Sequence, residues 1–244
     1  MKKKFLIILP ALLISLSACD IGALVSSLEN NASDDKSTEE EVESSTSIQS
    51  EEGNSFDDSI FDITESIEKL MAFGKDTGFE ITTKATDSDG TDYTYVLGMK
   101  GNIWWLIDES GGSGYQLNGD KCAMLTYDVE NQTWSTLIAN VGETQFKAMF
   151  ESLTSYLYKS NAYFANEGFT SNGEGTYARR DVLKFKYHRA VGTVSVDHEY
   201  FVDKDLGISI YQYAETRNGS EVSWAKLETT SFKTGNDVEA IVVS

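Results

Sequence analysis

Two histidines and the acidic residues beside them are the side chains of this sequence best suited to metal binding. His188 and His198 lie in neighbouring strand-like segments, and with Asp197 or Glu199 they could ligate a metal ion. In the alternating pattern of its segment, His198 falls on the same face as the apolar residues. His188 falls on the same face as two lysines. Opposite phases place side chains on opposite faces of a sheet. The pattern therefore favours a buried, hydrogen-bonded His198 and a surface His188 over a metal site.

Other chemistry-bearing patterns are incomplete. Asp87, Asp89 and Asp92 have part of the spacing of a calcium loop but lack its fifth ligand and terminal glutamate, so we interpret them as a solvated hairpin turn. Cys122 is expected to be a small buried hydrophobe. The sequence has no nucleophile elbow and no phosphate-binding glycine loop. We expect no enzyme, no metal and no cofactor; a polar pocket around His198 with clustered acids would favour the alternative, an enzyme of unknown type.

The charge of the chain excludes one class of partner. The 244 residues hold 20 Lys and Arg against 39 Asp and Glu, for a net charge of −19. Phosphate backbones need clustered cations, so nucleic acid is not an expected partner. Two cysteines are too few for a disulfide scaffold.

The N-terminus has the layout of an export signal. Three lysines, Lys2 to Lys4, precede an apolar run from Phe5 to Leu16. A membrane-spanning helix needs about 20 apolar residues, and this run is shorter. Residues 1–18 are therefore predicted to be a signal peptide.

The next residues resemble the lipobox of bacterial lipoproteins, in which leucine and two small residues precede a cysteine. Here they are Leu16-Ser17-Ala18-Cys19. The resemblance implies that Cys19 is acylated, with diacylglyceryl and palmitate groups, and becomes the mature N-terminus at the extracytoplasmic face of the cell membrane. An ordinary secretory signal with a chance cysteine and an uncleaved anchor are the alternatives. Asp20 resembles an inner-membrane retention signal if the host is diderm and has no meaning in a monoderm host.

Residues 19–58 have the composition of a tether. From residue 20 onward they hold 12 acidic residues and one lysine, with almost no large apolar side chain after Leu28. Such a segment cannot bury enough surface to offset the entropy of ordering, so we predict a disordered acidic stalk. The alternative is a tail that binds cations or a partner.

Periodic patterns begin near residue 59, and residues 59–244 are predicted to form one α+β domain. Apolar residues at helical spacing predict one helix from Ile60 to Met71, with Gly74 as its stop, and another from Phe146 to Leu157. The remaining pattern predicts antiparallel strands joined by tight turns. Two glycine-rich stretches, Ser110 to Gly114 and residues 166–178, are predicted to be loops. The run Ile103 to Ile107 is apolar at every position and should be covered on both faces.

Three stretches of this domain resemble the superfamily of periplasmic lipoprotein carriers and lipid-binding lipoproteins. They are the hairpins Tyr115 to Asp128 and Glu199 to Ile208 and the final strand Thr229 to Gly235. The resemblance implies an unclosed, antiparallel β-barrel, or half-barrel, whose open side is covered by helices and whose concave face holds acyl chains. Because this chain carries its own anchor signal, a stationary binder is expected rather than a shuttle.

Aromatic side chains are the candidate lining of such a site. They stand on neighbouring strand candidates, and burying each ring contributes roughly 1.5–3 kcal/mol. The candidates are Trp104, Trp105, Tyr93, Tyr95, Phe185 and Trp224. We predict a lipid or other apolar ligand bound by these rings. The alternative is that they fill a core, and that the protein is a cell-envelope interaction module with no small ligand, its protein partner being unknown.

Overall fold

The computed structural model describes residues 63–119, 121–138, 143–158, 164 and 167–243. These residues lie within one compact unit that spans residues 58–244. The predicted signal peptide, Cys19 and the predicted tether lie outside the described residues. The assignment of residues 1–18, 19–58 and 59–244 to three segments therefore stays a prediction.

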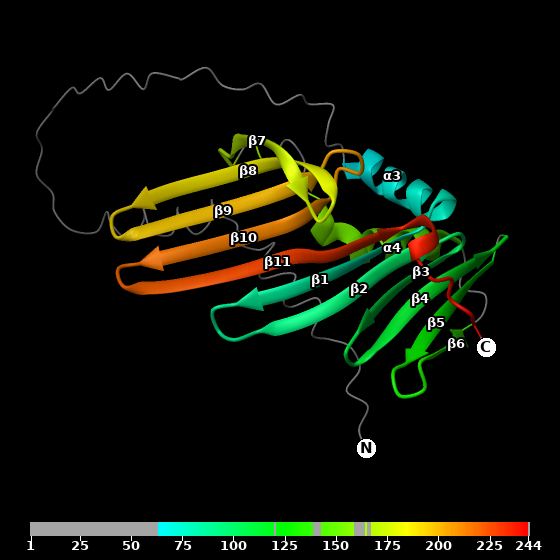
Figure 1. The fold of residues 1–244 in the computed structure, drawn as a ribbon. Coiled ribbons are helices and arrows are strands. Elements are labelled where there is room, and N and C mark those ends of the chain that lie inside the picture. Colours follow the sequence, from blue (N-terminus) through cyan, green and yellow to red (C-terminus); the bar gives the residue numbers. More distant parts are fainter. Residues whose placement is uncertain (1–62, 120, 139–142, 159–163, 165–166, 244) are drawn as a thin grey trace, which may run out of the picture. The chain divides into compact units, whose positions relative to one another are not determined.

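The described residues form eleven strands, two α-helices and two short 3-10 helices (Figure 1). The helical elements are α3 (Ile63–Asp76), α4 (Glu143–Thr154), η1 (Ser155–Leu157) and η2 (Gly235–Asp237). The strands are β1 (Phe79–Asp87), β2 (Asp92–Lys100), β3 (Ile103–Asp108), β4 (Gly111–Asn118), β5 (Lys121–Asp128), β6 (Thr133–Ile138), β7 (Thr170–Tyr177), β8 (Arg180–Val191), β9 (Val194–Asp203), β10 (Ser209–Asn218) and β11 (Glu221–Thr234).

All eleven strands belong to one antiparallel sheet, in the order β6-β5-β4-β3-β2-β1-β11-β10-β9-β8-β7. Each half is a meander of sequential hairpins, and the pairing of β1 with β11 joins the halves. The strands β6 and β7 stand at opposite edges, so the described sheet does not close on itself. The predicted unclosed antiparallel sheet with helices is confirmed.

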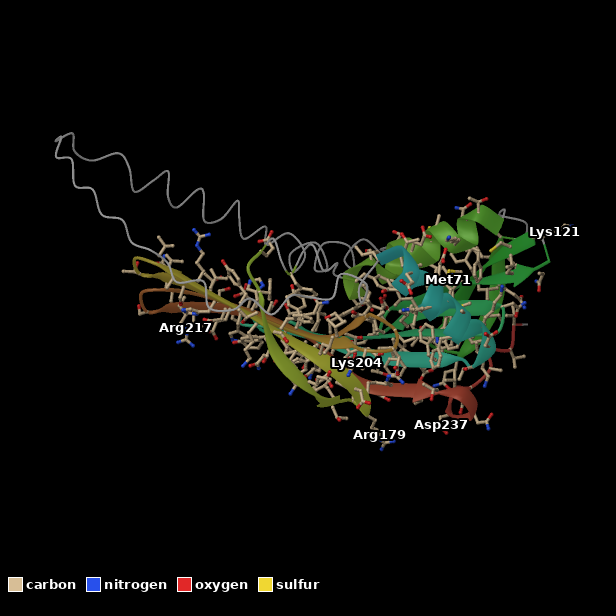
Figure 2. The ribbon with its side chains drawn as sticks, turned by 90° about the horizontal axis from the view of Figure 1, so that it is seen from above. Met71, Lys121, Arg179, Lys204, Arg217 and Asp237 are labelled. Atoms are coloured by element: carbon tan, nitrogen blue, oxygen red, sulfur yellow. The ribbon has the colours of Figure 1, made fainter. Side chains whose placement is uncertain are left out.

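Cross-strand register defines the two faces of the sheet. Met99, Trp104 and Tyr115 are neighbours on β2, β3 and β4 and share one face. Trp104 contacts Phe146 of α4, and Met99 lies against Gly74 of α3. We call this side the helix face and the opposite side the outer face. Figure 2 shows α3 and α4 together on the helix face.

The outer face of β3–β6 carries a second apolar cluster. Trp105, which alternates with Trp104 along β3, packs there with Ile103, Leu125 and Trp134. The segment after η2 covers the cluster, with Val238 fully buried and Val243 forming a parallel bridge to Trp134. The prediction that Ile103–Ile107 is covered on both faces is confirmed, and this covering segment is the reason.

The two stretches predicted to be loops are strands, so those predictions were wrong. Residues 111–114 begin β4, and residues 170–177 form the edge strand β7. Glycine in β4 is required by crowding: a Cβ on Gly114 would lie 2.6 Å from the carbonyl oxygen of Trp104, and one on Gly112 would lie 2.8 Å from Cβ of Tyr127. Close backbone approach is one of the positions where glycine occurs inside a strand.

Gly74 was also assigned wrongly. It lies inside α3, where it is buried and where a Cβ would lie 2.7 Å from the side chain of Met99. The helix continues to Asp76, and the left-handed residue beyond it is Gly78, with φ of 89°. Gly74 therefore serves helix–sheet packing rather than helix termination.

Candidate ligand-binding face

The centre of the helix face is a row of tyrosines. Tyr93 and Tyr95 project from β2 with ring centroids 6.1 Å apart, and Tyr156 of η1 meets Tyr95 edge-on at 5.6 Å. The hydroxyl of Tyr93 donates to the carboxylate of Asp108. Burial, together with Asp108 as acceptor, raises the pKa of Tyr93 well above its ordinary value. Tyr93 therefore stays a neutral donor at physiological pH.

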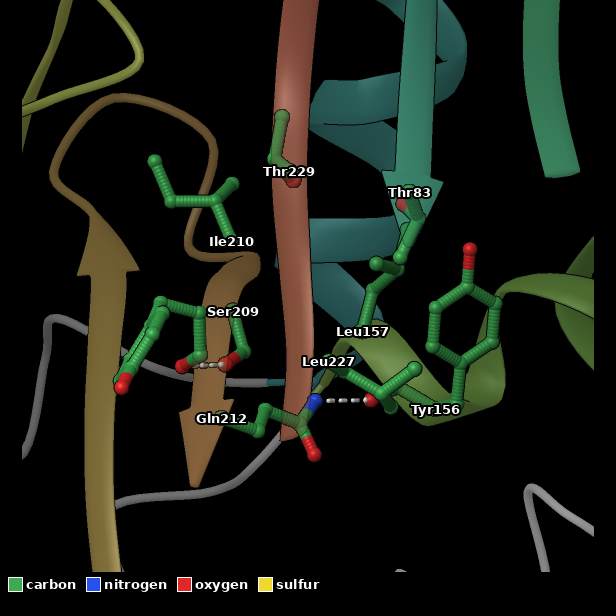
Figure 3. Close-up of a pocket in the computed structure, with 9 residues that line it drawn as sticks. Thr83, Tyr156, Leu157, Ser209, Ile210, Gln212, Leu227 and Thr229 are labelled. Carbon is green, nitrogen blue, oxygen red and sulfur yellow. Dashed lines mark hydrogen bonds between the residues drawn. The ribbon is translucent and has the colours of Figure 1, made fainter. Parts of the chain in front are cut away.

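Beside this row lies a small cavity of about 10 Å³, lined by Thr83, Tyr156, Leu157, Ser209, Ile210, Tyr211, Gln212, Leu227 and Thr229. Figure 3 shows Gln212 among the lining residues, where its Nε2 donates to the main-chain oxygen of Tyr156 over 2.8 Å. This bond ties β10 to η1. The space is close to that of one water molecule, so these side chains essentially fill the centre of the helix face.

The tyrosine hydroxyls here remain protonated. Burial, followed by the influence of Tyr156, raises the pKa of Tyr95 well above its model-compound value. Burial also raises the pKa of Tyr156 and of Tyr158. Neutral tyrosine hydroxyls can donate hydrogen bonds but do not act as bases at physiological pH.

A second group of rings covers the helix face of β8 and β9. Phe185 stacks on Phe164 with centroids 4.3 Å apart, and Tyr200 meets Phe164 edge-on at 5.6 Å. Phe169 contacts Tyr187, His198 and Tyr200 at 5.4–6.2 Å. We call these six residues the β8–β9 ring cluster. Phe164 and Phe169 come from the connection between α4 and β7, and their side chains cover the rings of β8 and β9.

The two histidines lie as their phases predict. His198 is buried in the β8–β9 ring cluster with an exposed fraction of 5%. His188 projects from the outer face, where its Nδ1 lies 2.7 Å from a carboxylate oxygen of Asp197. Within the described residues, no group of three or more His, Cys, Asp or Glu is arranged to hold a metal ion.

The aromatic candidates divide between the faces. Tyr93, Tyr95 and Phe185 lie on the helix face, as does Trp104, which stacks on Tyr115 at 5.0 Å and is fully buried. Trp105 and Trp224 lie on the outer face, the first under the C-terminal segment and the second beside Tyr213 at 6.5 Å. The structure therefore does not bring the six together, and the assignment of a ligand to the helix-face members remains a prediction.

Several residues of this face were not predicted. Tyr156 and Gln212 flank the cavity, and Phe164 and Phe169 complete the β8–β9 ring cluster. Gln212 is buried in β10 between the half-buried Tyr211 and Tyr213, an alternation too weak to single it out from the sequence. Phe164 and Phe169 lie outside the helices and strands that the sequence pattern predicts, so no sequence signal pointed to them.

The remaining chemical candidates are structural. Cys122 is buried, and burial raises the pKa of its thiol. Asp87 accepts hydrogen bonds from the amides of Asp89 and Thr91 over 2.9 Å, which closes the β1–β2 turn. Cys19 lies outside the described residues. In the part of the chain that the structure describes, no helix is both long and apolar enough to cross a membrane.

No protein-family model matches the chain, and no curated protein matches it. Solved structures matched with low scores include one of MucB in complex with MucA(peri), at 15% identity and a TM-score of 0.31, over 73% of this chain. The chain spans 57% of the length of that protein. A putative outer membrane lipoprotein-sorting protein domain from Vibrio parahaemolyticus matches at 7% identity and a TM-score of 0.24, over 71% of this chain and 92% of that domain. A LolA superfamily protein from Nitrosomonas europaea matches at 10% identity and a TM-score of 0.21, over 72% of this chain and 94% of that one.

Proposed function

We propose that this chain is a non-enzymatic envelope lipoprotein, anchored through acylated Cys19, whose domain binds an acyl chain or another apolar ligand on the helix face. The observation that carries the proposal is the β8–β9 ring cluster. It places six ring side chains on the helix face of an unclosed sheet, and Phe164 and Phe169 of the α4–β7 connection cover the rings of β8 and β9.

The chemistry of the cluster suits an apolar chain better than a polar ligand. Phe164, Phe169, Phe185 and Tyr200 are all at most 3% exposed, and their rings meet edge-on or stacked. Each methylene of an acyl chain transferred from water to such surroundings contributes about 0.8 kcal/mol. Because Phe164 and Phe185 are in direct stacking contact, an acyl chain would have to displace Phe164 and Phe169 from the rings of β8 and β9. It would then bind through apolar contact area, without an ion pair to direct it.

The test is binding of a pyrene-labelled fatty acid to the full chain in detergent, followed by fluorescence. The wild type should bind saturably. Tyr187→Glu should weaken binding by about tenfold or more, because it places a carboxylate beside the apolar chain. Phe185→Leu, which keeps a large apolar side chain, should weaken it less.

Tyr177→Leu is the matched control, because Tyr177 contacts Phe201 and Tyr211 on the outer face. It should bind the probe as the wild type does. Saturable binding that both Tyr187→Glu and Phe185→Leu leave unchanged would show that the probe binds elsewhere and would contradict the proposal.

A second function, an envelope interaction module with no small ligand, is favoured by one observation. The cavity over the central strands is about 10 Å³, far below the roughly 300 Å³ of small-molecule sites. Absence of probe binding together with a specific crosslinked envelope partner would support this second function over the first.

A further inference from the structure

The outer face carries an open trough of about 290 Å³, most of whose lining residues project from the side of the sheet opposite to the helices. Tyr187 and His198, which belong to the β8–β9 ring cluster, also border it. It is lined by Thr170, Lys186, Tyr187, His188, Asp197, His198, Glu199 and Tyr213. Cross-strand register explains how they meet: Thr170 pairs with Lys186, Lys186 with Glu199, and Glu199 with Tyr213. One row of side chains thus crosses four strands, from β7 to β10.

The charged groups of the trough are arranged in pairs. Lys186 Nζ lies 3.4 Å from a carboxylate oxygen of Glu199, and His188 Nδ1 lies 2.7 Å from Asp197. All four side chains remain partly accessible, with exposed fractions between 25% and 64%. An anionic ligand would find no surplus of cations here, because each cation already lies beside a carboxylate.

An aromatic platform borders these pairs. Tyr213 lies beside Trp224 of β11, with ring centroids 6.5 Å apart and planes inclined by 29°. The Tyr213 hydroxyl donates to Glu215 over 2.6 Å, which fixes the ring. Burial and the neighbouring Glu215 raise the pKa of Tyr213 to about 12, so the phenol stays neutral. Both rings are half-buried and reach the surface beside the paired charges.

From this arrangement we infer that the trough binds a neutral, polyhydroxylated ligand, namely a short oligosaccharide. Carboxylates accept hydrogen bonds from sugar hydroxyls, and the ammonium of Lys186 donates to them. The aliphatic C–H face of a pyranose packs on aromatic rings such as Tyr213 and Trp224. The volume lies near the lower limit of about 300 Å³ for small-molecule sites, which suits a few sugar units.

Isothermal titration of the full chain in detergent, with chitotetraose and with maltotetraose, tests the inference. At least one oligosaccharide should bind saturably with a Kd below about 10 mM. Trp224→Ala should weaken that binding by about tenfold, through loss of the stacking surface. Glu199→Gln and Asp197→Asn, which keep the side-chain volume, should weaken it by about threefold or more through loss of an ionic acceptor.

Leu137→Ala is the control, because Leu137 is exposed on β6 at the far edge of the sheet. This variant should bind as the wild type does. The inference is overturned if neither oligosaccharide binds saturably up to about 10 mM, or if all three trough variants bind like the wild type. This inference is independent of the proposed acyl site: Tyr187 borders both sites, but Phe185 borders only the helix-face cluster and Trp224 lies only on the outer face, so Phe185→Leu and Trp224→Ala let the two proposals fail separately.

Discussion

Asp203 and Arg180 form the most buried ion pair among the described side chains. The Asp203 side chain is fully buried and accepts from Arg180 Nε over 2.5 Å and from Nη2 over 3.1 Å. It also accepts from the amides of Asp205 and Leu206, so one carboxylate closes the β9–β10 turn and fixes β8 beside it. The sequence predicts this turn but not the arginine, which lies 23 residues earlier.

Asp203→Ala should therefore destabilise the domain by about 3–5 kcal/mol, because it leaves a partly buried guanidinium without its partner. Denaturant unfolding followed by tryptophan fluorescence measures the change. Asp205→Asn is the control: Asp205 also contacts Arg180, over 3.0 Å, but its side chain is 77% exposed. Its loss should cost less than about 1 kcal/mol. If both variants lowered the free energy of unfolding equally, the importance given to the burial of Asp203 would be contradicted.

Asp108 provides a residue-scale prediction about pH. Burial raises the pKa of this carboxyl, but hydrogen bonds from Ser110 and Tyr93 outweigh it, so the pKa lies below its ordinary value. A carboxyl with a lowered folded-state pKa contributes stability above its unfolded pKa, and this contribution is lost as the pH falls through the folded value. Asp108→Asn should destabilise the domain at neutral pH by about 1–2 kcal/mol and reduce the acid dependence of its unfolding. An unchanged pH profile would contradict this assignment.

At the scale of elements, the sheet depends on glycines inside its strands, and the sequence pattern misassigns those of β4. A Cβ on Gly98 of β2 would lie 2.2 Å from the ring of Trp105, and Gly114 of β4 is crowded by the backbone of β3. Because these glycines have no Cβ, Trp105 of β3 can pack closely against β2 and β4. A glycine-rich composition predicts a loop at β4 because glycine is generally unfavourable in strands. The sequence does not show that a neighbouring strand leaves no room for a side chain at these positions.

Gly98→Ala should therefore destabilise the domain by about 1–3 kcal/mol and change the near-ultraviolet signal of Trp105. Thermal unfolding and circular dichroism measure both effects. Gly175→Ala on β7 is the matched control, because its Cβ would meet only the flexible end of Lys184, at 2.9 Å. A Gly98→Ala protein as stable as Gly175→Ala would contradict the packing account.

The sequence predicts most strands, the two helices and the opposite phases of His188 and His198 from periodicity alone. It does not predict which residues meet on the helix face. The stacking of Phe164 on Phe185 joins residues from the α4–β7 connection and β8, and Tyr156 reaches Gln212 across 56 residues. Long-range contacts of this kind depend on register and bulges, such as those between Thr82 and Thr83 and between Ser209 and Tyr211, which no local pattern records.

At the scale of the whole molecule, the proposals assign a separate task to each part. The N-terminal signal and Cys19 determine location, the helix face binds an apolar chain, and the outer face binds a sugar. The two faces are separated by a single sheet, and cross-strand register keeps their side chains apart. One domain can therefore hold both ligands without competition between them.

The anchor has its own test. Cys19→Ala should move the protein from the membrane fraction to the soluble or secreted fraction, because the acyl chains that hold it at the bilayer cannot be attached. Cell fractionation with immunoblotting measures the distribution. Cys122→Ala is the control, since the buried thiol of Cys122 should leave the distribution unchanged. Unchanged membrane association of Cys19→Ala would contradict lipid anchoring.

The central claim, an apolar ligand on the helix face, is tested most directly by native mass spectrometry of the full chain after gentle extraction from its host membrane. The account predicts a bound species of lipid mass, beyond the covalent acyl groups, whose occupancy falls in Tyr187→Glu and persists in Tyr177→Leu. A spectrum with the covalent acyl groups alone, from protein that also fails to bind the fatty-acid probe, would contradict it.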